Sequence, residues 1–428
     1  MTIAHHQRLI MTLTLALAFA TLPVSASLSY QPDSIATDFD AEPDTIVVIA
    51  DESEITRPGR ASLQPAQPQP ADMPKWAQLM AKSEIKSSVD HTRLKSVDPW
   101  FRVMPFYSSL WKLGVRANAM AAFRLNRYDL LPQPSMVTMQ LRATFKGYFM
   151  LRSRARLYMP DRRQRVNIDI EGARKPLHFW GITVDDCRSN ERSKYIRLTA
   201  GLKAEYLYRP AGHFWFGPSA HASYVDGIHF GDASYIQGQP DHSYVTGLGL
   251  TAAFDSRDHA VSPSRGFYAA YRPMIYPARL GSCPLTFWSH RIDISAYMPL
   301  WRGATGAMNL FGAINSAGTP WTMLEMAGDD DVHLRGYTPG RYMANNHIGT
   351  QLEIRQHLWN RLGLTAWGGI SSMFSAFTHS SPRWSGMAWL PNYGFGFRLR
   401  LRPRINMRAD IGFGRGCRNF CVGIGEAF

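Results

Sequence analysis

The chain has few features that would make it a helical membrane protein or an enzyme. After residue 26 it has no apolar run close to the ~18 residues that a membrane-spanning helix needs, and the nearest candidate is the stretch at residues 117–123. It has no G-x-S-x-G motif, no H-E-x-x-H motif and no phosphate-binding loop. Ser289 and His290 are adjacent, and neighbours on a strand point to opposite faces, so they cannot form a catalytic pair. The sequence therefore predicts no enzyme, cofactor or metal site.

The N-terminus has the features of a secretory signal peptide. Arg8 precedes an apolar run at residues 9–22, and Pro23-Val24-Ser25-Ala26 provides small residues for cleavage. The alternative is a membrane-anchor helix. Residues 27–99 are rich in Pro and Gln and predict a mostly flexible periplasmic arm.

The formal charge of +14 and the pI of about 9.7 could suggest nucleic acid as a partner. An exported chain seldom meets nucleic acid, and the basic residues are spread along the sequence instead of gathered in tails. We therefore expect no nucleic-acid partner. Anionic lipid headgroups or a barrel interior lined with ions fit the charge better.

From residue 100 to the end, apolar and polar residues alternate with a period of two. In the stretch YGFGFRLRLR, Tyr393, Phe395 and Phe397 alternate with glycine and arginine. Turn residues separate about 16 such strands, the even number typical of single-chain bacterial barrels. Short turns alternate with long segments near residues 225–242, 315–346 and 374–389.

This pattern predicts an all-β fold, a transmembrane antiparallel β-barrel of about 16 strands over residues 100–428. A closed sheet of this width encloses water, so its inner face can carry many arginines. The alternative is a soluble β-sandwich, which would also alternate. The signal peptide, the strand count and the asymmetry between turns and loops favour the barrel, located in the bacterial outer membrane.

The last strand of the sequence also fits an outer-membrane barrel. The alternation predicts that four apolar residues share one face, and the chain ends on an aromatic residue. A terminal strand ending in Phe resembles the signal by which such barrels are recognised by the barrel assembly machinery that inserts them. The expected members of this signal are Phe420, Val422, Ile424 and Phe428.

One irregular stretch, GDDDVHLRGYTPGRY at residues 328–342, falls in the sixth long loop. The LRGY tetrapeptide inside it resembles the Arg-Gly-aromatic loop motif of the BamA/TamA superfamily of outer-membrane assembly and secretion barrels, also called bacterial surface antigens. The stretch GLGLTAAFDSRDHAVSPSRGFY at residues 247–268 is similar to the Asp-Ser-Arg-Asp periplasmic turn of that family. These motif residues are Leu334, Arg335, Gly336 and Tyr337 in the loop, and Asp255, Ser256, Arg257, Asp258 and Gly266 in the turn.

The resemblance implies that the loop folds into the barrel and that acidic residues of the wall hold Arg335. Glu353 is the expected partner, because it lies on the inner face of its strand. Where the family often carries an acid on the next strand, this chain has Gly369. The anchor is then Glu353 alone, or it includes an acid of the Asp329–Asp331 run. Calcium binding by this run is the alternative, although a calcium site needs more oxygen ligands.

Four cysteines in an exported chain could form disulfides. Cys417 and Cys421 are expected to flank the last hairpin turn, where a bridge across the turn would have a suitable Cα separation. Cys187 and Cys283 are expected in the third and fifth long loops, where they could pair with each other. Free thiols are the alternative for all four.

The resemblance implies a role in outer-membrane protein assembly or translocation. Expected partners are outer-membrane lipid and lipopolysaccharide, the assembly machinery for its own insertion, and outer-membrane protein clients. The chain resembles a short form, because the arm is too short and too rich in Pro for the tandem periplasmic domains that receive clients in relatives. The alternatives are a passive or plugged pore, or surface antigen, and, more remotely, a lipid-modifying enzyme.

Overall fold

The computed structural model describes residues 97–428 except 109–110, 124–134, 162, 189–190, 330–331, 376–386 and 403–404. The signal peptide and all but the last three residues of the Pro-rich arm lie outside the described residues, so both assignments stay predictions. Within the described part, almost all regular structure is β-strand.

The strands alternate with turns and loops along the whole described chain. They are β1 (Val97–Ser108), β2 (Lys112–Phe123), β3 (Ser135–Thr144), β4 (Phe149–Tyr158), β5 (Gln164–Phe179), β6 (Ser193–Tyr208), β7 (Phe214–Ile228), β8 (His242–Asp255), β9 (Gly266–Tyr276), β10 (Phe287–Pro299), β11 (Ala304–Asn315), β12 (Glu325–Met326), β13 (Met343–Ala344), β14 (Asn346–Trp359), β15 (Leu362–Phe374), β16 (Ala388–Arg402), β17 (Ile405–Gly414) and β18 (Cys417–Ile424). Single-turn 3₁₀ helices η2 (Asp186–Arg188), η3 (Ser234–Ile236), η4 (Ala278–Leu280) and η5 (Trp321–Met323) lie in the loops.

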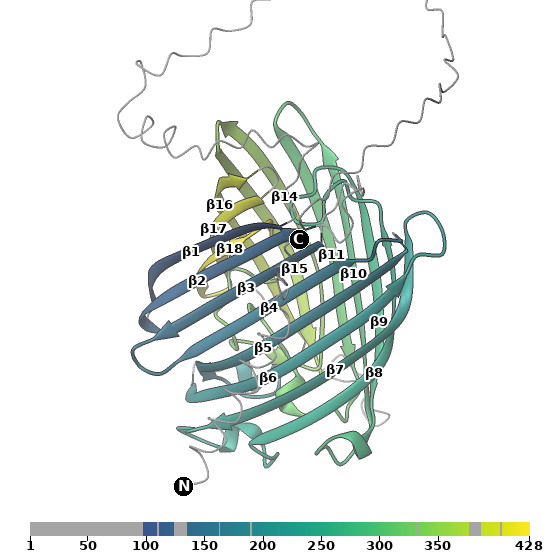
Figure 1. Ribbon diagram of the computed structural model, residues 1–428. Helices are drawn as coiled ribbons and strands as arrows, with labels where there is room; N and C mark the ends of the chain where they lie inside the picture. The colour runs from purple at the N-terminus through teal and green to yellow at the C-terminus, as the bar shows by residue number, and fades with distance from the viewer. Residues whose placement is uncertain are drawn as a thin grey trace, which may run out of the picture. The chain divides into compact units, whose positions relative to one another are not determined.

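Sixteen of these strands form one antiparallel sheet in sequence order, and the short β12 and β13 pair with each other. The sheet curls so that β1 and β2 pass beside β17 and β18 (Figure 1). A hydrogen bond of 3.2 Å from Arg116 Nη1 on β2 to the carbonyl of Val422 on β18 joins the two ends of the sheet. The expectation of an all-β barrel of about 16 strands is confirmed.

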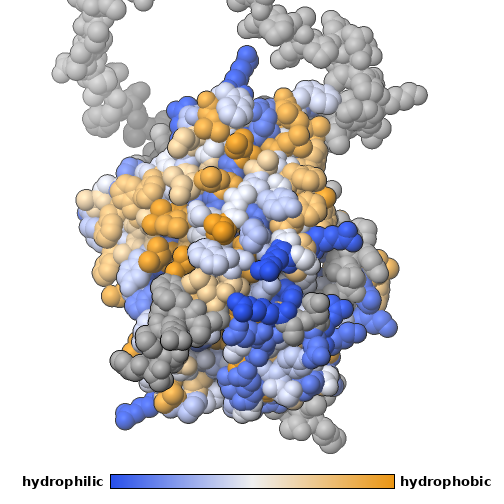
Figure 2. Space-filling model, turned by 180° about the vertical axis from the view of Figure 1, so that it is seen from behind, coloured by the Kyte–Doolittle hydropathy of each residue, from blue (hydrophilic) through white to orange (hydrophobic). Residues whose placement is uncertain are grey.

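The two faces of each strand differ as the alternation predicted. On β14, Leu352 and Ile354 are 60% and 44% exposed on the outer wall, whereas Glu353 is 1% and Arg355 8% exposed on the inner wall. On β16, Tyr393, Phe395 and Phe397 are exposed in the same way. Figure 2 shows hydrophobic side chains gathered over a broad zone of one outer face, with hydrophilic side chains below it. An apolar outer band of this kind suits the hydrocarbon core of a bilayer.

The connections at the two ends of the barrel differ in length. β1 starts and β18 ends at the same end, and most connections there are short, such as Asn360–Arg361 between β14 and β15. We call this the turn end. The opposite end, the loop end, carries the connections at 180–192, 229–241, 316–345 and 375–387, as the sequence predicted. No helix among the described residues is long and apolar enough to span a membrane.

Candidate functional site

The candidate site is the sixth long loop (L6, residues 316–345) together with the wall that it contacts. β12 and β13 pair at the base of L6, and Leu334, Gly328 and Gly340 have positive φ angles of 52°, 72° and 82°. These left-handed residues turn the chain repeatedly, which explains why the stretch is neither helix nor strand. Leu334, Arg335 and Tyr337 are buried to 1% exposure or less, so this part of L6 lies inside the barrel.

Arg335 contacts three strands of the wall through its guanidinium group. Its Nη2 atom donates to Oε2 of Glu353 on β14 at 2.7 Å, and its Nη1 atom donates to Oδ2 of Asp410 on β17 at 2.9 Å. The guanidinium carbon lies 4.0 Å from the ring centroid of Trp367 on β15. The planar fork of arginine suits two carboxylates and an aromatic face at once, whereas the single ammonium of lysine does not.

The two carboxylates belong to a larger buried charge network on the wall. Arg355 Nε lies 2.7 Å from Glu353, and Arg398 Nη1 lies 2.5 Å from Asp410. Glu426, near the C-terminus, joins the network through Arg398 Nε at 2.8 Å. With Arg408, which lies 3.4 Å from Asp410, the network holds four guanidinium groups and three carboxylates. Buried charges of this kind require such pairing, since each would otherwise lose its hydration without compensation.

Glycines on the inner wall make room for the backbone of L6. A Cβ atom on Gly336 would lie 2.4 Å from the backbone of Phe413, and one on Gly412 would lie 2.7 Å from the backbone nitrogen of Gly336. A Cβ atom on Gly414 would lie 2.4 Å from the ring of Tyr337. L6 therefore packs directly against the bare backbone of β17, and the glycines of the alternating pattern face it.

Tyr337 fixes the end of the tetrapeptide. Its hydroxyl donates to the carbonyl of Pro391 at 2.9 Å and accepts from the backbone N–H of Arg415 at 2.9 Å. Burial raises the pKa of this phenol to about 12, so it stays protonated and able to donate. The backbone N–H of Gly336 donates to Oδ1 of Asn392 at 2.8 Å. These three hydrogen bonds hold Gly336 and Tyr337 to β16 and to the β17–β18 turn.

The structure corrects the expected partners from the acidic run. Asp329 lies 2.7 Å from Nζ of Lys175 on β5, on another side of the barrel, and does not contact Arg335. Asp330 and Asp331 lie outside the described residues. The second acid is Asp410 on β17, which the sequence did not link to Arg335. At Gly369 a Cβ atom would lie 2.4 Å from the carbonyl oxygen of Thr350, so the wall is too tight there for an acidic side chain.

The Asp-Ser-Arg-Asp motif forms a closed turn at the turn end. Asp255 accepts from Nε and Nη2 of Arg257, both at 2.9 Å, and Asp258 Oδ1 accepts from the backbone N–H of Ser264 at 2.9 Å. Ser256 Oγ accepts from the N–H of Phe267 and donates to its carbonyl. Gly266 has a φ of 105° and would carry a Cβ atom only 2.4 Å from the carbonyl oxygen of Ser256.

The C-terminal residues do not share one face as the sequence predicted. β18 ends at Ile424, Gly425 has a φ of 84°, and the last residues turn into the barrel. Phe420 is 61% exposed on the outer wall, whereas the ring of Phe428 lies 5.4 Å from the guanidinium of Arg355 inside. The N–H of Glu426 donates to the carbonyl of Val261 in the Asp-Ser-Arg-Asp turn, so turn and tail meet. Val422 lies on β18, and the side chain of Ile424 lies outside the described ones.

All four cysteines are free thiols, and the expected pairings are not formed. Cys417 and Cys421 both lie on β18, paired with Gly414 and Asp410, so the last turn does not lie between them. Four residues of strand separate their Cα atoms by roughly 13 Å, too far for a disulfide. Cys187 packs in a cluster with Leu334 and Tyr337, whereas Cys283 packs in another cluster with Tyr276.

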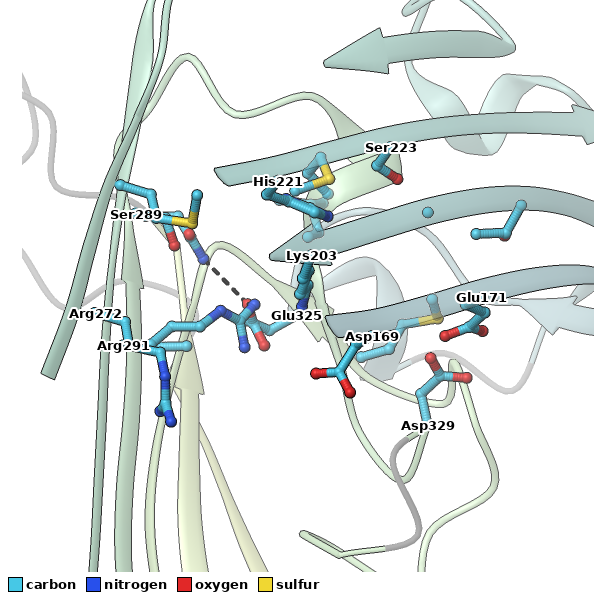
Figure 3. Close-up of a pocket in the computed structure, with 18 of the residues that line it drawn as sticks. Asp169, Glu171, Lys203, His221, Ser223, Arg272, Ser289, Arg291, Glu325 and Asp329 are labelled. Atoms are coloured by element: carbon cyan, nitrogen blue, oxygen red, sulfur yellow. Dashed lines mark hydrogen bonds and ion pairs between the residues drawn. The ribbon is translucent and has the colours of Figure 1, made fainter. Parts of the chain in front are cut away.

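A second inner surface holds a cavity of about 490 Å³ between β4–β11 and L6. Figure 3 shows acids and bases pointing into it, among them Asp169, Lys203, Arg272 and Asp329. Most are paired, for example Arg272 with Glu205 at 3.0 Å and Arg152 with Glu171 at 3.0 Å. The described residues contain no group of three or more side chains placed to hold a metal ion.

No protein-family model and no curated protein matches the sequence. Solved structures of outer-membrane barrels are similar at a distance. One is BamA from Haemophilus ducreyi lacking POTRA domains 1–3, with 10% identity and a TM-score of 0.45, and the match covers 76% of this chain and 67% of that chain. Another is CdiB from Escherichia coli, with 11% identity and a TM-score of 0.47, and the match covers 77% of this chain and 62% of that chain. A third is CdiB from Acinetobacter baumannii, with 11% identity and a TM-score of 0.46, and the match covers 77% of this chain and 59% of that chain.

The chain spans less than two thirds of each of the two CdiB chains. At such identities and with TM-scores below 0.5, these likenesses are too distant to assign a family or an activity.

Proposed function

We propose that this chain is an integral outer-membrane barrel that takes part in the assembly or translocation of outer-membrane proteins. The observation that carries the proposal is Arg335, fully buried inside the barrel and bound by Glu353 and Asp410. A long loop held in this way by a buried bidentate contact is costly to maintain, because two carboxylates and a guanidinium must be desolvated together. A passive wide pore has no need of such a device.

The two ends of the sheet support the same proposal. Among the described residues, the strand pairings run from β1 to β18 without a backbone ladder between these two strands. The bond between Arg116 and Val422 holds the ends together through a side chain. Strand edges that are not fully paired can accept a further strand from another chain by backbone hydrogen bonding. A client strand could therefore be added at this edge, while L6 holds the neighbouring strands β14–β17 in place.

The surroundings of the barrel follow from this proposal. In this proposal the apolar outer wall contacts outer-membrane lipids and lipopolysaccharide, and the last strand serves its own insertion by the assembly machinery. Clients would be other outer-membrane proteins. The loop motif, the Asp-Ser-Arg-Asp turn and the C-terminal residues are proposed to position the barrel for this work, and no catalytic residue is assigned.

Depletion of the protein in its native host tests the proposal directly. We expect selective loss of a set of other outer-membrane proteins, quantified by mass spectrometry of outer-membrane fractions. Complementation with the wild-type chain restores this set, whereas an Arg335→Ala chain inserted to the same level restores it only in part. An unchanged outer-membrane proteome would contradict the proposal.

One observation favours a second candidate, a plugged pore or surface antigen. L6 fills part of the barrel from the loop end, while the Asp-Ser-Arg-Asp turn and the C-terminal tail enter from the turn end. The conductance of the purified barrel in planar bilayers, combined with the depletion experiment, distinguishes the two candidates. A pore that opens when L6 is released, with no change in other outer-membrane proteins, would support this alternative.

A further inference from the structure

A cavity of about 580 Å³ lies at the turn end of the barrel, between the ends of β11, β14, β15 and β16 and the Asp-Ser-Arg-Asp turn. We call it the turn-end cavity. Its volume falls within the ~300–1,000 Å³ of small-molecule pockets and is larger than a single inorganic ion requires. It lies at the opposite end of the barrel from the base of L6. Its lining includes Arg355, Arg398 and Glu426 of the buried charge network, but no residue of L6.

Arginines dominate the polar side of the turn-end cavity. Arg265 comes from the Asp-Ser-Arg-Asp turn, Arg361 from the β14–β15 turn and Arg400 from β16. The N–H of Arg400 donates to the carbonyl of Arg361 at 2.7 Å, so these two residues are direct neighbours. Within the described part of the chain, none of the three guanidinium groups has a hydrogen bond or an ion pair.

The acid that lines the turn-end cavity cannot neutralise them. Glu426 already lies 2.8 Å from Arg398 and 3.6 Å from Arg355, and it accepts a hydrogen bond from Asn406. The cavity therefore keeps three uncompensated positive charges at its mouth. Guanidinium groups in such a setting bind phosphate oxygens well, because each can donate two parallel hydrogen bonds.

The other side of the turn-end cavity is apolar and belongs to the outer wall. Trp301 is 59% exposed and Leu364 49% exposed, and Pro299 lies beside them. The indole N–H of Trp301 donates to Oε1 of Gln356 at 2.7 Å, which holds its ring at the rim. Tryptophans at the ends of barrel strands are typical of the membrane–water interface, where the ring contacts lipid and the N–H finds a polar partner.

We propose that the turn-end cavity binds an anionic membrane lipid, with the phosphate headgroup on Arg265, Arg361 and Arg400 and the acyl chains along Trp301 and Leu364. The combination of unpaired guanidinium groups with an apolar outer rim favours a lipid. A free phosphate ion would use only the arginines, and an acidic polypeptide would not use the lipid-facing rim. The site depends on the barrel lying in a membrane and does not depend on the handling of client proteins.

The test uses the purified full chain in an uncharged detergent and measures bound lipid by native mass spectrometry. The probe is a short-chain phosphatidylglycerol, compared with the phosphatidylcholine of the same chain length, inorganic phosphate and a polyglutamate peptide. We expect phosphatidylglycerol to bind, and phosphate and the peptide to fail to displace it at equal concentration. If each guanidinium contributes about fivefold, an Arg361→Gln/Arg400→Gln chain binds it roughly 25-fold more weakly.

The matched control removes two exposed arginines at the loop end, Arg279→Gln with Arg418→Gln, and should change binding less than twofold. A semi-native gel verifies that each chain is folded, and the single variant Arg265→Gln replaces the double variant if that chain fails to fold. Equal losses in site and control variants would overturn the proposal. Full displacement by phosphate, which indicates an ion site, or tighter binding of polyglutamate, which indicates a polypeptide site, would overturn it as well.

Discussion

Replacing Arg335 by Ala tests how L6 is held. The substitution removes two charge-assisted hydrogen bonds, of 2.7 Å to Glu353 and 2.9 Å to Asp410, and the contact with the ring of Trp367. Removing one partner of a buried ion pair costs about 3–5 kcal/mol. Here the network changes from four guanidinium groups and three carboxylates to three of each, so the remaining charges can still pair. We therefore expect the lower part of that range, about 3 kcal/mol, which favours the released loop by roughly a hundredfold.

Chymotrypsin is the suitable probe of loop release, since Tyr337 and Tyr342 are buried in L6 and the substitution leaves both cleavage sites intact. We expect rapid cleavage of the folded Arg335→Ala barrel at these tyrosines and a lower temperature at which the folded band is lost on a semi-native gel. Arg335→Lys should resemble Arg335→Ala more than the wild type, because one ammonium cannot bridge two strands and stack on an indole.

Arg291 provides a matched control. It forms an ion pair with Glu325 at the base of L6, but its side chain is 46% exposed. Exposed pairs contribute about 0–1 kcal/mol, so Arg291→Ala should leave cleavage and heat resistance close to those of the wild type. If Arg335→Ala protects L6 as well as the wild type does, or if both variants release it equally, the reasoning from the buried network is refuted.

Three further predictions follow from the same geometry. Gly412→Ala should displace L6, because the added Cβ atom would lie 2.7 Å from the loop backbone. Gly368→Ala should be tolerated, because the nearest atom to its Cβ would lie 3.9 Å away. Chymotrypsin cleavage of L6 measures the effect of both variants. Burial acts to raise the pKa of Asp329, but the Lys175 ammonium outweighs it and holds that pKa below its usual range. The stabilisation by this pair is therefore present above about pH 3.9 and lost as the pH falls through the folded value, and Asp329→Asn should remove this acid-dependent step from heat-resistance curves. Burial raises the pKa of the Cys187 thiol to about 11, so a thiolate-selective reagent at neutral pH should label it only after unfolding, and rapid labelling of the folded barrel would contradict its placement.

The alternation of apolar and polar residues was sufficient to predict the architecture of this protein. Because apolar residues recur with a period of two, all of them lie on one face of a strand, and this face turns toward lipid. Turn residues divide the chain into strands of similar length. The long segments expected near residues 225–242, 315–346 and 374–389 are the connections 229–241, 316–345 and 375–387. The same alternation placed Glu353 on the inner wall, where it is buried.

The loop motif predicted that Arg335 lies at the inner wall with Glu353 as a partner, but the sequence did not identify the second partner, Asp410. Asp410 lies 75 residues away along the chain, and strand alternation gives the face of a residue without its height along the barrel. That height depends on the register of every intervening strand. Trp367 and the glycines of β17 were visible only as members of an alternating pattern, and their contacts with L6 arise from the closure of the sheet.

The path of the C-terminal tail and the separation of Cys417 from Cys421 follow from the tertiary structure. A single left-handed residue, Gly425, turns the tail inward, so Phe428 leaves the face that Phe420 keeps. The last turn is formed by Arg415 and Gly416 and not by the residues between Cys417 and Cys421, so both cysteines lie on β18. Local periodicity fixes which face a side chain occupies within a strand, because sterics act between neighbours. Where a strand stops, and which distant strand faces it, depends on the packing of the whole barrel.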